Sequence, residues 1–297
     1  MATTITATLV QKLRSRTGAG MMDCKKALEA AEGDIDAAAD AMRKSGKIQA
    51  EKKSARIAAE GLVLIKSNSG YSIILEINCE TDFVSRDENF TQFAEEVTQL
   101  ALDKKIESVA SLLTASPVTG GQTVENKRQN LIAKLSENIQ IRRLALVTAQ
   151  SGSLLGAYVH MGRIGAIVEL QGGDEQLAKD LALHIIANNP LVISSDDVSN
   201  EVLAKEREIF TAQAQASGKP QAVIDKMIEG RIHKFLDEVS LLGQSFVKDE
   251  TIHIKELLER SQAKVVRFIR FAVGEGIEKP TEDFAKAVMD QVKASEE

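Results

Sequence analysis

The chain has 297 residues, of which 43% are hydrophobic, 27% charged and only 4% aromatic. Its length allows two or more domains with a sizeable core, and its many Ala, Leu, Glu and Lys residues favour a helix-rich protein. The formal net charge of −6 argues against a general nucleic-acid binder. The two cysteines, Cys24 and Cys79, are far apart and form no CxxC pair, which indicates a cytoplasmic protein without a disulfide framework or a zinc site.

Charge is distributed unevenly along the chain. Residues 1–56 hold 11 Lys and Arg against 7 Asp and Glu, a net +4, and the remaining residues hold 26 against 36, a net −10. A basic segment on an acidic body suggests an acidic partner surface for that segment, although a solvated face would produce the same pattern. Residues 1–6 lack the basic and apolar stretches of a signal peptide, and no run approaches the ~18 apolar residues that span a bilayer. We therefore expect no membrane association.

Residues 5–45 are predicted to form three short helices. Thr6 is a suitable N-cap for the first helix, Asp23 for the second and Asp34 for the third. Each predicted helix is too short to be stable alone, so the three are expected to pack as a small bundle. A polar, helix-favouring connector, residues 46–56, follows them.

Two later stretches share one pattern: a turn glycine, an apolar strand ending near a glutamate, and an amphipathic helix. In the first, the strand ends near Glu76 and the helical pattern begins at Phe93. In the second, a hairpin over residues 155–170 turns at His160-Met161-Gly162, its strand ends near Glu169 and the helical pattern begins at Leu177. The chain is therefore expected to contain two related halves.

The first half carries extra residues between its strand and its helix. From Glu76 to Phe93 is 93 − 76 = 17 positions and from Glu169 to Leu177 is 177 − 169 = 8, so the excess is 9. Connections of this kind usually need about 2–6 residues. Phe83 lies in the excess, and two hypotheses stand for it: a contact made with another protein, or a side chain buried under its own loop.

The rest of the chain is predicted to contain a loop at 114–122, a helix at 124–135 and a strand at 139–147. Residues 199–239 are typical of an antiparallel helical hairpin. Thr251 is expected to cap a short helix before a strand at 265–273, and Pro280-Thr281 to begin a terminal helix. The apolar seam of the hairpin is predicted from Ile224, Ile228, Phe235 and Val239 on one arm and Val202, Ile209 and Phe210 on the other.

No catalytic constellation is found in the sequence. It contains no GxxxxGK[ST] phosphate loop, no GxSxG elbow and no HExxH zinc pair. The four histidines have no metal-ligand spacing, and Glu80, Asp82 and Asp87 are a weak candidate for magnesium because acidic loop residues are usually solvated. The pattern indicates a binding protein that is not an enzyme and needs no metal or cofactor.

Two long stretches of sequence resemble one known family. Residues 13–28, LRSRTGAGMMDCKKAL, and residues 76–84, EINCETDFV, resemble the two signatures of the bacterial translation elongation factor Ts family. Residues 138–143 and 270–276 add support. The resemblance covers the whole chain and implies a guanine-nucleotide exchange factor for the GTPase elongation factor Tu, acting in protein biosynthesis in the cytoplasm.

The resemblance also implies an α+β fold with five parts. These would be a UBA-like three-helix module (1–55), a first core subdomain (56–153), a second, related core subdomain (154–195 and 242–276), an inserted helical hairpin for dimerisation (196–241) and a carboxy-terminal helical module (277–297). Both core subdomains would hold antiparallel sheets. A homodimer through the hairpin is expected, and direct nucleic-acid binding is not.

Site residues follow from the same resemblance. Thr81, Asp82, Phe83 and Val84 match the segment that enters beside the magnesium site of elongation factor Tu·GDP, dislodges Mg²⁺ and releases GDP so that GTP can bind. Further partner contacts are implied at Lys25, His160 and Val247, although Lys248 beside Val247 is less apolar than the family pattern. The alternative reading is a ribosome- or RNA-associated helical protein that uses the basic segment, which the acidic body disfavours.

Overall fold

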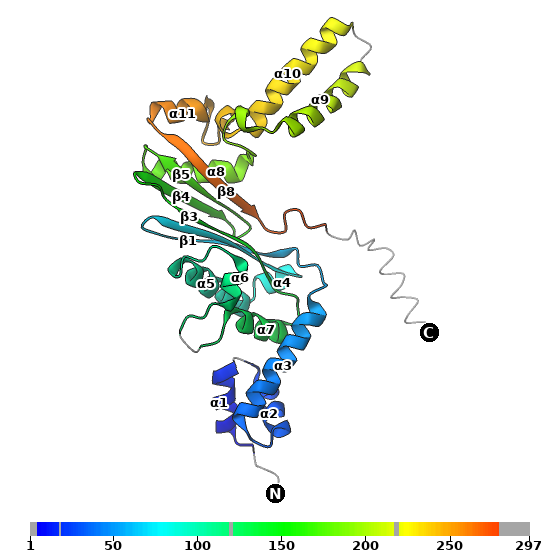
Figure 1. Ribbon diagram of the computed structural model, residues 1–297, viewed down its shortest axis with the longest axis vertical. Helices are drawn as coiled ribbons and strands as arrows, with labels where there is room; N and C mark the ends of the chain where they lie inside the picture. The colour runs from blue at the N-terminus through cyan, green and yellow to red at the C-terminus, as the bar shows by residue number, and fades with distance from the viewer. Residues whose placement is uncertain (1–4, 18, 119–120, 217–219, 279–297) are drawn as a thin grey trace, which may run out of the picture.

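A computed structural model describes residues 5–278, apart from residues 18, 119–120 and 217–219. The described chain is α+β and elongated (Figure 1): a helical head lies at one end, two antiparallel sheets with their covering helices lie in the middle, and a helical hairpin projects at the other end. The predicted fold class is therefore confirmed. The terminal helix expected from Pro280 lies outside the described residues.

The head consists of α1 (Ala7–Thr17), α2 (Met21–Ala30) and α3 (Ile35–Lys53) around a small apolar cluster. The Thr6 hydroxyl accepts a bond from the Leu9 amide, and Asp34 caps α3 as expected. The cap predicted at Asp23 is wrong, because α2 already begins at Met21 and its N-cap is Gly20. The polar connector is not a separate segment: α3 continues through it to Lys53, since its helix-forming residues pack against α7 of the core.

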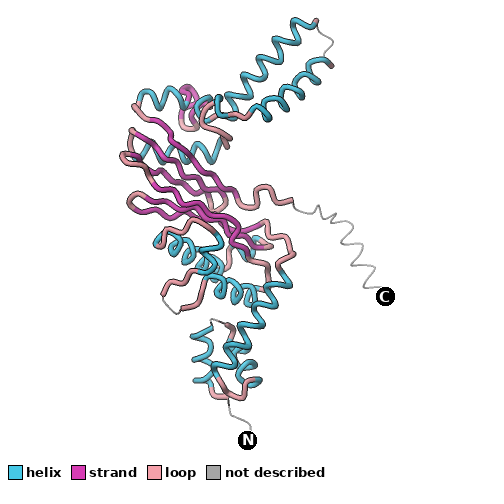
Figure 2. The backbone as a smooth tube through the Cα atoms, viewed as in Figure 1, coloured by secondary structure: helices cyan, strands magenta, loops and turns pink. Residues whose placement is uncertain are grey.

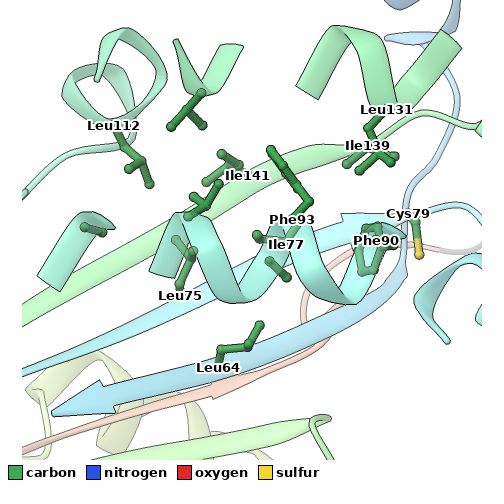
Figure 3. Close-up of a cluster of buried hydrophobic side chains, with 14 of the residues drawn as sticks. Leu64, Leu75, Ile77, Cys79, Phe90, Phe93, Leu112, Leu131, Ile139 and Ile141 are labelled. Carbon is green, nitrogen blue, oxygen red and sulfur yellow. The ribbon is translucent and has the colours of Figure 1, made fainter. Parts of the chain in front are cut away.

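The first half is a three-stranded sheet in the order β1-β2-β3, built from β1 (Glu60–Asn68), β2 (Tyr71–Cys79) and β3 (Gln140–Thr148). Helices α5 (Glu88–Asp103), α6 (Val109–Thr114) and α7 (Val124–Leu135) pack on it and enclose the largest apolar cluster of the described chain (Figure 3). The predicted bounds of α7 are confirmed. The side chains labelled in Figure 3 include Leu75, Ile77, Phe90, Phe93, Leu112 and Ile139.

The second half repeats this plan with the strand order β4-β5-β8: β4 (Ser153–His160), β5 (Ile164–Gln171) and β8 (Lys264–Ala272). Helices α8 (Glu175–Asn188) and α11 (Ile254–Arg260) cover it, and a short ribbon of β6 (Ser245–Phe246) and β7 (Asp249–His253) packs beside them. The hairpin turn at His160 is where the sequence predicted it. Thr251 lies within β7, so its predicted cap is wrong; α11 begins after His253 without a side-chain cap.

The two sheets lie against each other (Figure 2), and their shared face holds a small apolar cluster that includes Val63, Ile74 and Ile167. The middle strand of each sheet carries a fully buried glutamate, Glu76 in β2 and Glu169 in β5. Each glutamate stands opposite an arginine of the neighbouring strand, Arg143 or Arg267, and is followed at once by a shift in strand register. The halves are therefore equivalent in register as well as in strand order, which supports the expected duplication.

Each buried carboxylate also bonds to the other half of the core. Glu76 accepts from the Gly274 amide at 2.8 Å, just after β8, and Glu169 accepts from the Gln150 amide at 2.6 Å, just after β3. The two amide donors occupy equivalent positions in the two halves. They are 274 − 150 = 124 residues apart, and the two arginines are also 267 − 143 = 124 residues apart. The guanidinium groups also bond to the other half: Arg143 donates to the Ala272 carbonyl, and Arg267 donates to the Thr148 carbonyl.

The projecting hairpin consists of α9 (Asn200–Gln215) and α10 (Gln221–Val239) (Figure 1). Its expected antiparallel form is confirmed, but part of the predicted seam is wrong. Val202 and Ile209 are 39% and 40% exposed, because the adjacent face of α9, with Leu203, Phe210 and Ala214, turns toward α10 instead. On α10 the buried stripe consists of Ile224, Ile228 and Ile232, and the predicted Phe235 and Val239 do not belong to the cluster.

Candidate partner-binding site

The longer connection in the first half is present and contains a helix of its own. Residues 80–87 join β2 to α5, whereas only residues 172–174 join β5 to α8. The excess is smaller than the nine residues expected, because β2 continues to Cys79 and α5 begins at Glu88 rather than near Phe93. Within the connection lies the single-turn helix α4 (Asp82–Ser85).

Local bonds hold α4 in place. Thr81 is its N-cap, and the Thr81 hydroxyl oxygen accepts from the Val84 amide at 3.3 Å. At the other end, the Ser85 hydroxyl donates to the Asp82 carbonyl at 2.8 Å. Val84 is buried in the apolar cluster of the first half, so it anchors the helix instead of presenting its side chain at the surface.

Phe83 projects from this anchored helix into solvent with 83% of its surface exposed. The hypothesis that Phe83 is buried under its own loop is therefore wrong. Burying Val84 and Ser85 on the inner side of one helical turn leaves Phe83 on the outer side. The outward direction of the ring is thus imposed by the packing of its neighbours.

Asp82 lies on the exposed side of α4 and forms an ion pair with Arg86 at 2.9 Å. The Arg86 side chain is largely exposed and that of Asp82 is half-exposed, so the pair stabilises the fold little. Its carboxylate belongs to the residue that precedes Phe83 on the same helical turn. Arg86 was not singled out in the sequence, although its i, i+4 spacing from Asp82 was a usable signal.

A carboxylate from the loop before β3, at the same end of the sheet, holds the start of the connection. One oxygen of Glu137 accepts from the backbone amides of Glu80 and Thr81, each at 3.0 Å, and the other accepts from the Thr81 hydroxyl at 2.6 Å. In return, the Glu80 carboxylate accepts from the Asn138 amide at 2.6 Å. We call these four residues the carboxylate junction. Sequence reasoning missed Glu137, because nothing local relates residues that are 56 positions apart.

The predicted contact His160 lies at the same end of the sheets as α4. His160 ends β4, and the turn after it contacts β1, where Arg163 forms an ion pair with Glu60 at 2.6 Å. Glu60 in turn stands opposite Cys79, the last residue before the connection. Met161, next to the histidine, is 83% exposed, as Phe83 is. These are the two most exposed large apolar side chains in the described part of the chain.

Cys79 lies beneath this surface but is not a reactive thiol. It is buried and donates to the Thr81 carbonyl at 3.1 Å. Burial, together with the carboxylates of Glu137 and Glu60, raises the pKa of the Cys79 thiol to about 12. A thiol that stays protonated is a poor nucleophile and a poor metal ligand. The chemistry available at this surface is therefore contact and displacement.

The other two predicted contacts lie elsewhere. Lys25 is on α2 of the head, half-exposed and 3.8 Å from Glu29. Val247 lies between β6 and β7 in the second half, 36% exposed, and its amide donates to Nδ1 of His184 at 3.1 Å. The structure thus brings residues 81–84 and His160 to one end of the sheets and leaves Lys25 and Val247 on separate parts of the molecule.

Over the described residues, no group of three or more His, Cys, Asp and Glu side chains could hold a metal ion. The same part of the chain contains no helix that is long and apolar enough to cross a membrane.

Comparisons with known proteins agree on one family. A family model described as elongation factor TS matches residues 80–275. An elongation factor Ts of Francisella tularensis subsp. novicida (strain U112) is 55% identical over 289 residues, which cover 97% of this chain and 99% of the relative. An elongation factor Ts of Legionella pneumophila (strain Lens) is 51% identical over 292 residues, covering 98% of this chain and 99% of the relative.

Proposed function

This chain belongs to the elongation factor Ts family, and we propose that it is the guanine-nucleotide exchange factor of the GTPase elongation factor Tu. Family membership gives it a role in translation elongation. In the proposed cycle it binds elongation factor Tu·GDP in the cytoplasm, dislodges Mg²⁺ and releases GDP, after which GTP binds. No covalent bond is made or broken, so the protein is not an enzyme in this cycle.

The observation that carries the proposal is Phe83. An aromatic ring that is 83% exposed at the tip of an anchored single-turn helix has no role in the core of this chain. It is suited to enter a gap in a partner. A GTPase holds its nucleotide through magnesium and a nest of backbone amides around the phosphates. An inserted ring can separate these groups, and the carboxylate of the preceding residue, Asp82, adds negative charge near the cation.

The other contacts extend the proposed interface along the molecule. Lys25 places a positive charge on the head, His160 and Met161 lie at the end of the sheets, and Val247 lies in the second half. Contacts spread in this way can hold the GTPase while the ring acts on its nucleotide site. The proposed homodimer through the hairpin uses α9 and α10, which project from the end of the molecule opposite the head.

Thermodynamic linkage gives the proposal a clear test. If binding of this protein weakens GDP binding by some factor, GDP must weaken the binding of this protein by the same factor. Mixing with nucleotide-free elongation factor Tu should give a stable complex that excess GDP dissolves. A complex that GDP leaves intact contradicts exchange activity. RNA retention with a steep salt dependence would instead favour the RNA-associated alternative.

The mechanism is tested by the release of a fluorescent GDP analogue from elongation factor Tu. We expect Phe83→Ala and Asp82→Ala to stimulate release poorly and Val223→Ala, which changes an exposed apolar side chain on the hairpin, to match the wild type. If the pair acts on magnesium, the deficit of both variants should shrink in EDTA relative to excess Mg²⁺. An equal deficit in both conditions would falsify the magnesium step. Phe83 would then act by displacing the phosphate-binding loop of elongation factor Tu.

A further inference from the structure

The helix that carries Phe83 cannot be stable by itself. α4 has four residues, and isolated helices shorter than about 12–15 residues are marginal in water. Burial of Val84 and Ser85 on its inner side turns Phe83 outward, but a single turn keeps this arrangement only while its first residues are held. The order of α4 therefore depends on what holds the backbone where the connection enters the helix.

That backbone is held by one side chain of another segment. Glu137 lies between α7 and β3 and accepts three bonds, from two consecutive amides and from the hydroxyl of the helix cap, Thr81. Hydrogen bonds to an ionised carboxylate are stronger than those between neutral groups. Two adjacent amides directed at one oxygen also fix the plane in which the chain enters α4.

We propose that Glu137 is a positioning residue for nucleotide exchange: it holds residues 80–85 so that Phe83 already has its inserting orientation before the partner arrives. The inference rests on the proposed function and adds a residue to it. Ordering a loop only on binding consumes part of the interaction free energy, and a loop that is already ordered avoids that loss.

The junction also relates the ring to the head. The Glu80 carboxylate accepts from the Asn138 amide and lies 3.5 Å from the Arg56 guanidinium. The Asn138 side-chain amide donates to the Arg56 carbonyl at 2.8 Å, just beyond the end of α3. Glu80 and Asn138 thus connect the end of α3, which carries the head, to the connection that carries Phe83. One frame can therefore present Lys25 and Phe83 together.

The effect of removing Glu137 on stability can be separated from its effect on residues 80–85. Glu137 and the two residues that it binds, Glu80 and Thr81, are only partly buried. Removal of the Glu137 side chain should therefore leave the global fold intact and loosen residues 80–85 locally. Under the proposal, Glu137→Ala should show a nearly unchanged melting temperature, and amide hydrogen exchange should accelerate roughly tenfold or more at Glu80 and Thr81.

The functional readout is GDP release from elongation factor Tu as a function of factor concentration. Glu137→Ala should lower the maximal rate roughly tenfold, with a smaller change in the half-saturating concentration, because the head and second-half contacts remain. Glu137→Gln should recover part of the rate, since its one carbonyl oxygen can still accept from both amides. The control is Glu96→Ala, which removes an ion-paired carboxylate from α5 that does not touch residues 80–85.

The decisive comparison uses the double variant. If Glu137 acts through the ring, Glu137→Ala should cause no further loss in a Phe83→Ala background. Equal losses in both backgrounds overturn the proposal, and so does unchanged hydrogen exchange at residues 80–85. If Glu137→Ala does not fold, Glu137→Gln takes its place, and its smaller loss should likewise disappear in the Phe83→Ala background. If the wild-type protein fails to release GDP from elongation factor Tu, the proposed function is contradicted. The hydrogen-exchange measurements would still test whether Glu137 holds residues 80–85.

Discussion

Phe83 and Phe90 are seven residues apart and have opposite environments. Phe90 is fully buried in the first half, whereas Phe83 is 83% exposed. The sequence alone could not decide between burial and exposure for Phe83, because a Phe near charged residues is compatible with both. What decides is the inward packing of Val84, which depends on the position of α4 over the sheet and not on local sequence.

This contrast gives a matched pair of variants. Phe83→Ala should leave the free energy of unfolding within about 0.5 kcal/mol of the wild type, as is usual for surface substitutions. Phe90→Ala should lower it by ~3–5 kcal/mol, because it leaves a cavity. Denaturant unfolding measures both. A large loss of stability in Phe83→Ala would mean that the ring packs on its own chain, which contradicts its assignment to a partner.

His184 is a buried histidine whose tautomer follows from its bonds. Its Nδ1 accepts from the Val247 amide, so the proton resides on Nε2, which faces the Gln244 side-chain oxygen at 3.0 Å. Burial lowers the pKa of His184 below 6.5, partly offset by the bond to Gln244. The neutral ring therefore holds the turn that carries Val247, one of the proposed contacts.

The lowered pKa fixes the sign of a pH effect. The unfolded chain takes up a proton at His184 near pH 6.5 while the folded chain does not, so stability is complete above that pH and is lost as the pH falls toward the folded pKa. Between pH 7.5 and 5.5 the melting temperature should therefore fall less in His184→Gln than in the wild type. His233→Gln, on the exposed side of α10, is the control and should follow the wild type. If the melting temperatures of all three proteins fall equally with pH, His184 is not the cause of the loss of stability.

Helices and strands were predicted best where one face is buried along their whole length. The bounds of α7 and the turn between β4 and β5 came directly from periodicity and turn residues. The failures have tertiary causes. Packing against α7 extends α3 through a polar segment, and pairing with β6 places Thr251 in a strand. On α9, two apolar residues turn to solvent because a neighbouring stripe meets α10.

The hairpin should be removable as a unit. Its apolar cluster lies between α9 and α10, and its base is tied to the second half through the Val239 carbonyl, which accepts from the Leu191 amide. Replacing residues 201–236 with a short glycine–serine linker should therefore leave the melting temperature of the core nearly unchanged. If the hairpin joins two copies, light scattering should show the mass falling to that of a monomer. If the measured mass falls only by the mass of the deleted residues, the hairpin is not the dimer contact.

The duplication was visible in the sequence, but the bonds that join the halves were not. Periodicity located both strands that end near a glutamate and both following helices. It could not show that Glu76 bonds to Gly274, 198 positions away, or that Glu169 bonds in the same way to Gln150. Pairings of this length depend on how two sheets stack. For the same reason, residues 81–84 were identified through a resemblance, whereas their support by Glu137 had to be observed.

The buried carboxylates should be essential to the joined core. Burial would raise the pKa of Glu76, but the Gly274 amide and the guanidinium groups of Arg143 and Arg142 outweigh it, so the pKa lies below 4.5. Glu76→Gln removes the charge that these groups surround. Breaking a buried pair in this way typically destabilises by ~3–5 kcal/mol. Glu95→Gln, which breaks a surface pair with Lys66, should lower stability by about 1 kcal/mol or less.

The pH dependence separates the charge from the shape of the side chain. Because the folded pKa of Glu76 is depressed, its stabilising contribution is complete above about pH 4.5 and is lost as the pH falls through the folded value. The stability gap between the wild type and Glu76→Gln, measured by urea unfolding, should therefore be widest near pH 7 and should narrow below pH 4.5. A gap that stays constant down to pH 3 would assign the loss to packing, and the two halves would then be joined mainly by the apolar face between the sheets.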